Sequence, residues 1–158
     1  MNTGENLIPI KSILIAEDNP NDVELTLGAL EESKLANDVV VTHDGAEALD
    51  YLYARGPFAG RAGGNPAVVM LDLKMPRVDG LEVLRQIKAD PVLHRIPVVV
   101  LTSSREESDM VRSYELGVNA YVVKPVDFQQ FLEAIRSVGV FWALVNEPPP
   151  GCVRHRHP

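Results

Sequence analysis

The chain has 158 residues, 46% of them hydrophobic and 23% charged, a balance that is typical of one globular domain with a single core. Its formal net charge of −7 argues against nonspecific binding to nucleic acid or to an anionic membrane. No apolar run approaches the roughly 20 residues of a membrane-spanning helix. The N-terminus lacks a signal-peptide pattern, and a single cysteine, Cys152, excludes an intrachain disulfide. We therefore expect a cytoplasmic protein without nucleic-acid or membrane partners.

Short apolar runs alternate with helical patterns along the chain. The runs expected to form strands are residues 12–16, 38–43, 67–72, 97–102 and 119–124. Each run is followed by a segment with apolar residues at helical spacing. The runs are continuous rather than alternating, which is typical of a parallel sheet covered by helices on both faces. We predict an α/β fold, a flavodoxin-like doubly wound (βα)5 domain with a five-stranded parallel sheet of order 2-1-3-4-5.

Capping residues indicate where the helices begin. Asn19 is expected to cap the first helix, with Pro20 at its first position. A cap followed three residues later by a glutamate occurs at Asp44 and Glu47, Asp79 and Glu82, and Ser104 and Glu107. Gly56 is the expected stop of the second helix.

The domain limits follow from composition. Residues 1–10 read as an N-terminal extension, and residues 11–145 as the folded domain with an extended last helix. Residues 146–158 are rich in proline and basic residues, so we expect a disordered tail.

Charged and polar side chains stand at four of the five strand ends. These are Glu17 and Asp18 after the first strand, Asp72 in the third, Thr102 in the fourth and Lys124 in the fifth. In the predicted order these four strands are neighbours, so the side chains should form one cluster. Clustered carboxylates repel one another, and Mg²⁺ is their natural partner. A carboxylate held there can attack a phosphoryl group, while Mg²⁺, the lysine and the threonine hydroxyl stabilise the transferred oxygens.

Four segments in order, "ILIAEDNPND", "VVMLDLKMPRVDGLEVL", "VVVLTSS" and "AYVVKPVD", resemble the receiver domain of bacterial two-component response regulators over about residues 11–138. The resemblance implies that Asp72 is the phosphoacceptor and that Asp18 ligates Mg²⁺. It implies that Glu17 acts through a water and that the Lys74 carbonyl is a third protein ligand. Thr102 and Lys124 would contact the phosphoryl group.

A finer pattern is similar to single-domain regulators paired with phytochrome-type histidine kinases. It includes "AEDNPNDVELTLGAL", "LANDVVVTHDGAEALDYLYARG" and the Phe141–Trp142 pair after the last helix. The implied partners are a phytochrome-type sensor kinase and an unidentified downstream protein. Tyr121 resembles the family's switch aromatic, which turns inward when Thr102 engages phosphate; an ordinary half-buried strand tyrosine is the equal alternative.

Phe141 and Trp142 lie beyond the apolar stripe of the last helix, which favours a contact surface. We expect a homodimer through the fourth helix, fifth strand and fifth helix, with Tyr121 at the interface.

Other functions remain open or fit less well. The protein could be an intermediate phosphate carrier in a multistep phosphorelay, or an interaction module that acts without phosphorylation. An aspartyl phosphatase needs Asp-x-Asp, but position 74 is lysine. A flavodoxin-like cofactor site needs backbone donors, whereas "EDNPND" would repel a flavin phosphate. We expect no enzyme activity besides self-phosphotransfer and autodephosphorylation.

Overall fold

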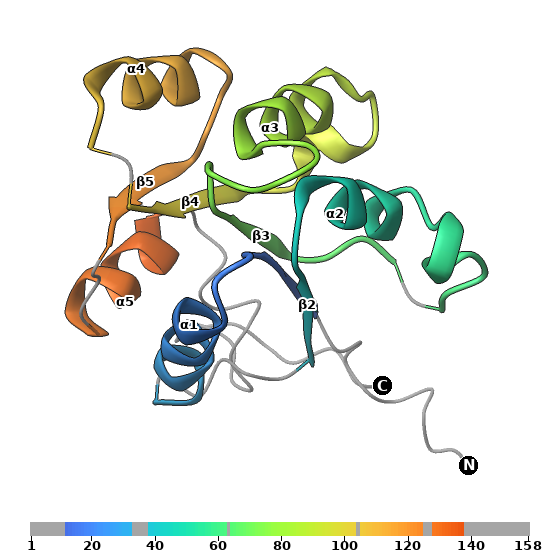
Figure 1. The fold of residues 1–158 in the computed structure, drawn as a ribbon, viewed down its shortest axis with the longest axis horizontal. Coiled ribbons are helices and arrows are strands. Elements are labelled where there is room, and N and C mark those ends of the chain that lie inside the picture. Colours follow the sequence, from blue (N-terminus) through green and yellow to red (C-terminus); the bar gives the residue numbers. More distant parts are fainter. Residues whose placement is uncertain (1–11, 33–37, 63, 104, 125–127, 138–158) are drawn as a thin grey trace, which may run out of the picture.

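A computed structural model describes residues 12–32, 38–62, 64–103, 105–124 and 128–137. Its five parallel strands form one sheet in the order β2-β1-β3-β4-β5 (Figure 1). Their bounds are β1 Ser12–Ala16, β2 Asp38–Thr42, β3 Val68–Leu71, β4 Val98–Thr102 and β5 Ala120–Val123. The predicted fold class and strand order are confirmed.

Helices cover both faces of the sheet. They are α1 Pro20–Glu32, α2 Gly45–Leu52, α3 Gly80–Ala89, α4 Glu107–Glu115 and α5 Phe128–Ser137, with short 3-10 turns at η2 Gly56–Phe58 and η3 Leu93–Arg95. α1 and α5 lie on one face, and α2, α3 and α4 lie on the other (Figure 1). None of the helices in the described ranges has the length and apolar character needed to cross a bilayer.

The sheet has one apolar core on each face. In β1, Leu14 and Ala16 pack with α2 and α3, whereas Ile13 and Ile15 pack with Leu30 of α1. Every residue of β3 and β4 is buried, while the residues of the edge strand β5 are half-buried. Burial on both faces explains why the central strands are continuous apolar runs.

Three of the four predicted helix caps are present. The Asn19 side chain accepts hydrogen bonds from the backbone N–H groups of Asn21 and Asp22. Asp44 and Asp79 cap α2 and α3 by accepting from the backbone N–H three residues later. α2 ends at Leu52, four residues before the predicted stop, and Gly56 begins η2 with a φ of 59°.

The predicted start of α4 is wrong. The helix begins at Glu107, and its N-cap is Glu106, whose side chain makes no capping hydrogen bond. The third helical position is then Asp109, which is buried and pairs with Lys74. Ser104 lies outside the described residues, as do residues 1–10 and 146–158, so the domain limits remain predictions.

Candidate functional site

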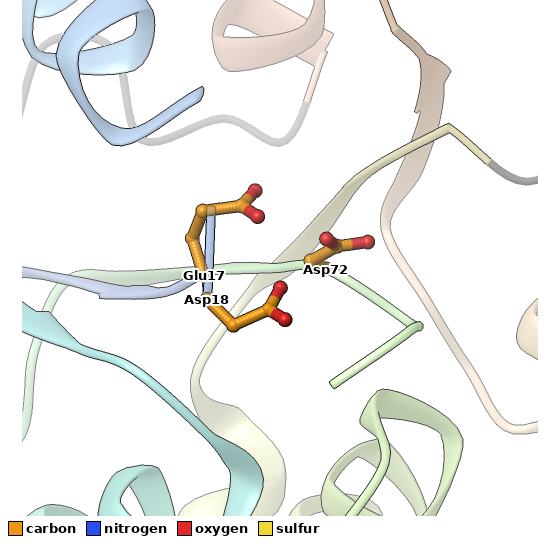
Figure 2. A group of neighbouring side chains, drawn as sticks. All are labelled: Glu17, Asp18 and Asp72. Atoms are coloured by element: carbon orange, nitrogen blue, oxygen red, sulfur yellow. The ribbon is translucent and has the colours of Figure 1, made fainter. Parts of the chain in front are cut away.

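Three carboxylates lie together at the carboxyl end of the sheet. Glu17 and Asp18 follow β1, and Asp72 follows β3 (Figure 2). One oxygen atom of each lies within 4.8 Å of the other two. Glu17 and Asp72 are buried, with 4% and 6% of their surface exposed, whereas Asp18 is exposed. The structure thus brings together the acidic residues that the strand-end argument selected.

The sheet fixes the backbone of these acids. The Asp72 N–H donates to the Ala16 carbonyl at 3.0 Å, and the Glu17 N–H donates to the Thr42 carbonyl at 2.9 Å. These bonds continue the parallel ladders one residue past each strand. The carboxylates of Glu17 and Asp72 are therefore carried by backbone that is hydrogen-bonded in the same way as the strands.

Lys124 follows β5 and reaches the same place. Its N–H donates to the Thr102 carbonyl at 2.8 Å, which continues the ladder between β4 and β5. Its Nζ donates to Glu17, to Asp22 at 2.8 Å and to Asp72 at 3.4 Å. The lysine side chain is only 11% exposed. A buried ammonium thus offsets part of the negative charge of the cluster.

The crowding of charges changes the acidity of Glu17. Burial, together with the nearby Asp72 carboxylate, raises the pKa of Glu17 from 4.5 to about 7, against the opposing effect of Lys124. Burial alone would lower the pKa of Lys124, but its hydrogen bonds to Asp22 and Glu17 raise it. Near neutral pH the metal-free cluster therefore holds a charged lysine and a partly protonated Glu17.

The donor set suits a hard divalent cation. All three groups offer carboxylate oxygens, which Mg²⁺ and Mn²⁺ prefer over nitrogen or sulfur ligands. The three oxygen atoms all lie within 4.8 Å of one another, near enough for one ion to contact more than one of them after small side-chain movements. The amide nitrogen of Lys74 lies 3.4 Å from Asp72 Oδ1, but the predicted role of the Lys74 carbonyl remains a prediction.

Two glycines hold the loop that follows Asp72. The Gly80 N–H donates to the Leu73 carbonyl at 2.8 Å, and a Cβ on Gly80 would lie 2.2 Å from the Asp72 carbonyl oxygen. A Cβ on Gly45 would lie 1.9 Å from the carbonyl oxygen of Val78 in the same loop. Because any side chain would collide with backbone, only glycine allows α2 and α3 to approach the loop this closely.

An ion pair fixes the far end of this loop. Arg77 binds the Asp44 carboxylate through Nε at 2.9 Å and through its terminal nitrogen at 3.0 Å. The Arg77 guanidinium lowers the pKa of Asp44 below its usual value. Asp44 therefore both caps α2 and anchors the loop that carries Asp72.

Thr102 and Tyr121 lie where the sequence placed them. Thr102 ends β4, is fully buried, and pairs in register with Val123 of β5. Tyr121 is half-buried in β5, and the centre of its ring is 6.5 Å from that of Tyr114 in α4. Their roles as phosphoryl contact and switch remain predictions. Phe141 and Trp142 lie outside the described residues.

Sequence reasoning missed Asp22, the third residue of α1. A search restricted to strand ends cannot find a side chain that enters the site from a helix. The available signal is an acidic residue in the first turn of the helix that directly follows Glu17 and Asp18.

Known proteins resemble this chain over most of its length. The family model for the response regulator receiver domain matches residues 13–136. Response regulator Rcp1 of Synechocystis sp. is 37% identical over 134 residues, covering 85% of this chain and 90% of Rcp1. The Mn²⁺-bound structure of Rcp1 has a TM-score of 0.72 at 36% identity and covers 89% of this chain and 99% of its own.

Two further solved structures are similar. The bacteriophytochrome response regulator RtBRR is 63% identical with a TM-score of 0.80, covering 90% of this chain and 86% of its own. The phosphorylated cyanobacterial phytochrome response regulator RcpA is 41% identical with a TM-score of 0.72, and the match covers 85% of this chain and 95% of the RcpA chain. The chain therefore belongs to the response regulator receiver domain family, among relatives described as phytochrome response regulators.

Proposed function

We propose that Asp72 accepts a phosphoryl group from a sensor histidine kinase of the phytochrome type, in a reaction that depends on Mg²⁺. One observation carries the proposal: the Asp72 carboxylate lies beside the Glu17–Asp18 pair and 3.4 Å from the ammonium of Lys124. This proximity supports a reaction in which Asp72 is the nucleophile, the three carboxylates are cation ligands and Lys124 supplies a positive charge.

The chemistry requires no other nucleophile. A carboxylate oxygen of Asp72 attacks phosphorus on the kinase phosphohistidine, the P–N bond breaks, and the imidazole nitrogen retains the electron pair and takes up a proton. The products are an acyl phosphate on Asp72 and an unmodified histidine. The chain is consumed as a phosphoacceptor in each event, so we assign it a signalling role rather than that of an enzyme.

Each neighbour has a part in this reaction. Mg²⁺ held by Asp18, Asp72 and, through a water, Glu17 would offset the charge on the phosphoryl oxygens. Lys124 donates to a phosphoryl oxygen from the β5 side, and the Thr102 hydroxyl donates from the end of β4. Tyr121 then moves with Thr102 and carries the change to the surface of α4 and β5.

The names of similar proteins support the choice of kinase partner, and the surface of α4, β5 and α5 supports the choice of binding face. Two of the similar solved structures are named as phytochrome response regulators, which supports a phytochrome-type kinase as donor. The output face comprises α4, β5 and α5, where a groove is lined by Arg105, Tyr114, Tyr121, Gln130 and Glu133. We assign this face to homodimerisation and to the downstream protein.

The test is direct. The purified protein is mixed with acetyl phosphate and Mg²⁺, and its intact mass is measured beside that of the Asp72→Asn variant. We expect the gain of one phosphoryl group, absent from the variant and absent without Mg²⁺. Autophosphorylated phytochrome-type kinases are then compared with unrelated histidine kinases as donors, and the phytochrome type should transfer fastest. No gain from acetyl phosphate or from any kinase would overturn the proposal.

A further inference from the structure

The Lys124 ammonium has a carboxylate partner that does not belong to the three-carboxylate cluster. Two of its partners, Glu17 and Asp72, are members of that cluster. The third is Asp22, whose Oδ2 lies 2.8 Å from Nζ and which comes from α1 rather than from a strand end. Asp22 therefore approaches the lysine from outside the set of cation ligands.

Asp22 is held in place by the helix that carries it. It is the third residue of α1, and its N–H donates to the Asn19 side chain at 3.2 Å. The free N–H groups at a helix N-terminus favour a negative charge at this position. Its side chain is 28% exposed, so it lies at the edge of the site while its oxygen faces the buried lysine. Asp22 is thus a fixed anchor point for a flexible side chain.

The demands of phosphoryl transfer distinguish Asp22 from the other two partners. Glu17 and Asp72 would hold a bound cation, and phosphorylation would convert the Asp72 carboxylate to an acyl phosphate. An ammonium has three N–H donors, and a long lysine side chain loses considerable rotamer freedom when it is held in one place. Asp22 is the partner that the reaction leaves available to keep Nζ in position.

We propose that Asp22 is a positioning residue that holds the Lys124 ammonium in the site through phosphorylation, so that a remaining N–H donates to a phosphoryl oxygen on Asp72. The phosphoryl part of this inference rests on the function proposed above. The anchoring of Nζ by Asp22 is a property of the unphosphorylated protein and can be tested by itself.

The first test observes the lysine directly. In protein labelled with ¹⁵N-lysine, the Lys124 ammonium signal is identified by its loss in Lys124→Met. Hydrogen exchange at this ammonium should quicken about tenfold in Asp22→Asn, the size expected for losing one charge-assisted hydrogen bond. The control is Glu24→Gln, which removes one exposed charge from the same helix and should leave the signal unchanged. An unchanged signal in Asp22→Asn would overturn the anchoring.

The second test measures phosphorylation by acetyl phosphate with Mg²⁺. Asp22→Asn should slow the reaction about tenfold, while Glu24→Gln should not. In a Lys124→Met background, adding Asp22→Asn should have no further effect, because the residue acts through the lysine. If Asp22→Asn slows phosphorylation equally in the wild-type and Lys124→Met backgrounds, the role of Asp22 is merely structural and the proposal is overturned. The proposal is also overturned if Asp22→Asn does not slow phosphorylation of the otherwise wild-type protein.

The two tests separate this inference from the proposed function. If the wild type takes up no phosphoryl group from acetyl phosphate or any kinase, the proposed function and the phosphoryl part of the inference both fail. If the wild type is phosphorylated normally and Asp22→Asn matches it in rate and in the lysine signal, only the role of Asp22 fails.

Discussion

The ammonium of Lys74 lies 3.2 Å from Oδ2 of Asp109, so an ion pair joins the loop after Asp72 to the first turn of α4. The Asp109 side chain is only 12% exposed, and its hydrogen bond raises the pKa of Lys74. α4 carries exposed apolar side chains, including Val111 and Tyr114. One side chain therefore links the phosphoacceptor loop to a surface suited to binding a partner.

We expect Lys74 to protect the acyl phosphate from water. Replacing it by the shorter, neutral asparagine should speed self-dephosphorylation several-fold, because the long cationic side chain two residues after Asp72 would no longer shield the acyl phosphate from water. The measurement is the loss of the phosphoryl mass with time after acetyl phosphate is removed. Arg85→Asn is the matched control, since it removes an exposed cation of α3 whose partner is Glu82. Equal decay in Lys74→Asn and wild type would refute the idea.

The sequence predicted the sheet and the strand-end residues because both depend on local patterns. Continuous apolar runs marked the strands, and strand order alone brought Glu17, Asp18, Asp72 and Lys124 to one edge. The contacts made by helix residues could not be predicted in this way. Asp22 meets Lys124 across 102 positions of sequence, and such pairs follow only from how the helices dock.

The start of α4 likewise could not be predicted from a local sequence pattern. Ser104 and Glu107 have the spacing of a capping box, but the helix begins two residues later than that pattern implies. The buried acid Asp109 pairs with Lys74 from a loop far away in sequence. A tertiary contact accompanies the shifted start, and no local pattern reveals it.

Gly80 should be irreplaceable although it begins a helix. In Gly80→Ala the new Cβ would lie 2.2 Å from the Asp72 carbonyl oxygen and 2.6 Å from Leu73 Cα, so the loop must move. We expect a loss of more than about 2 kcal/mol in the free energy of unfolding, and slower phosphorylation of Asp72. Urea unfolding and acetyl phosphate uptake measure the two effects.

The control for this substitution is Gly28→Ala. Gly28 lies in α1, and a Cβ there meets nothing within 4 Å. Alanine should stabilise the protein by about 0.5–1 kcal/mol, because glycine is unfavourable inside a helix. If Gly80→Ala proves as stable as the wild type, the loop is not held as described.

The proposed dimer should depend on the exposed face of α4. Tyr114 is 53% exposed and contacts the Tyr121 ring, so Tyr114→Glu places a charge at the centre of the expected interface. Sedimentation should show a shift from dimer toward monomer at micromolar concentration. Leu25→Glu on α1 is the control, because Leu25 is 68% exposed, α1 is not part of the expected interface, and α1 lies on the face of the sheet opposite to α4 (Figure 1). A wild type that is monomeric at micromolar concentration would exclude the dimer.

Glu17 should make the stability of the metal-free protein fall as the pH rises. Its pKa is about 7 in the folded protein and 4.5 in the unfolded chain. At pH values between 4.5 and about 7 the folded state therefore binds more protons at this group than the unfolded state does. The stability that this group contributes is fully present below pH 4.5 and is lost as the pH rises through about 7. A shift of this size corresponds to about 3 kcal/mol.

Comparing wild type with Glu17→Gln isolates this contribution, since the other carboxylates titrate in both proteins. Urea unfolding at several pH values between 4.5 and 8 should show the wild type losing stability relative to the variant. The loss arises because burial and the Asp72 carboxylate penalise the ionised Glu17. Saturating Mg²⁺ should remove most of the difference between the two proteins in how steeply the free energy of unfolding changes with pH, because a divalent cation favours ionised carboxylates. Parallel pH profiles without metal would mean that Glu17 is ionised throughout this range, and that Lys124 already compensates its charge.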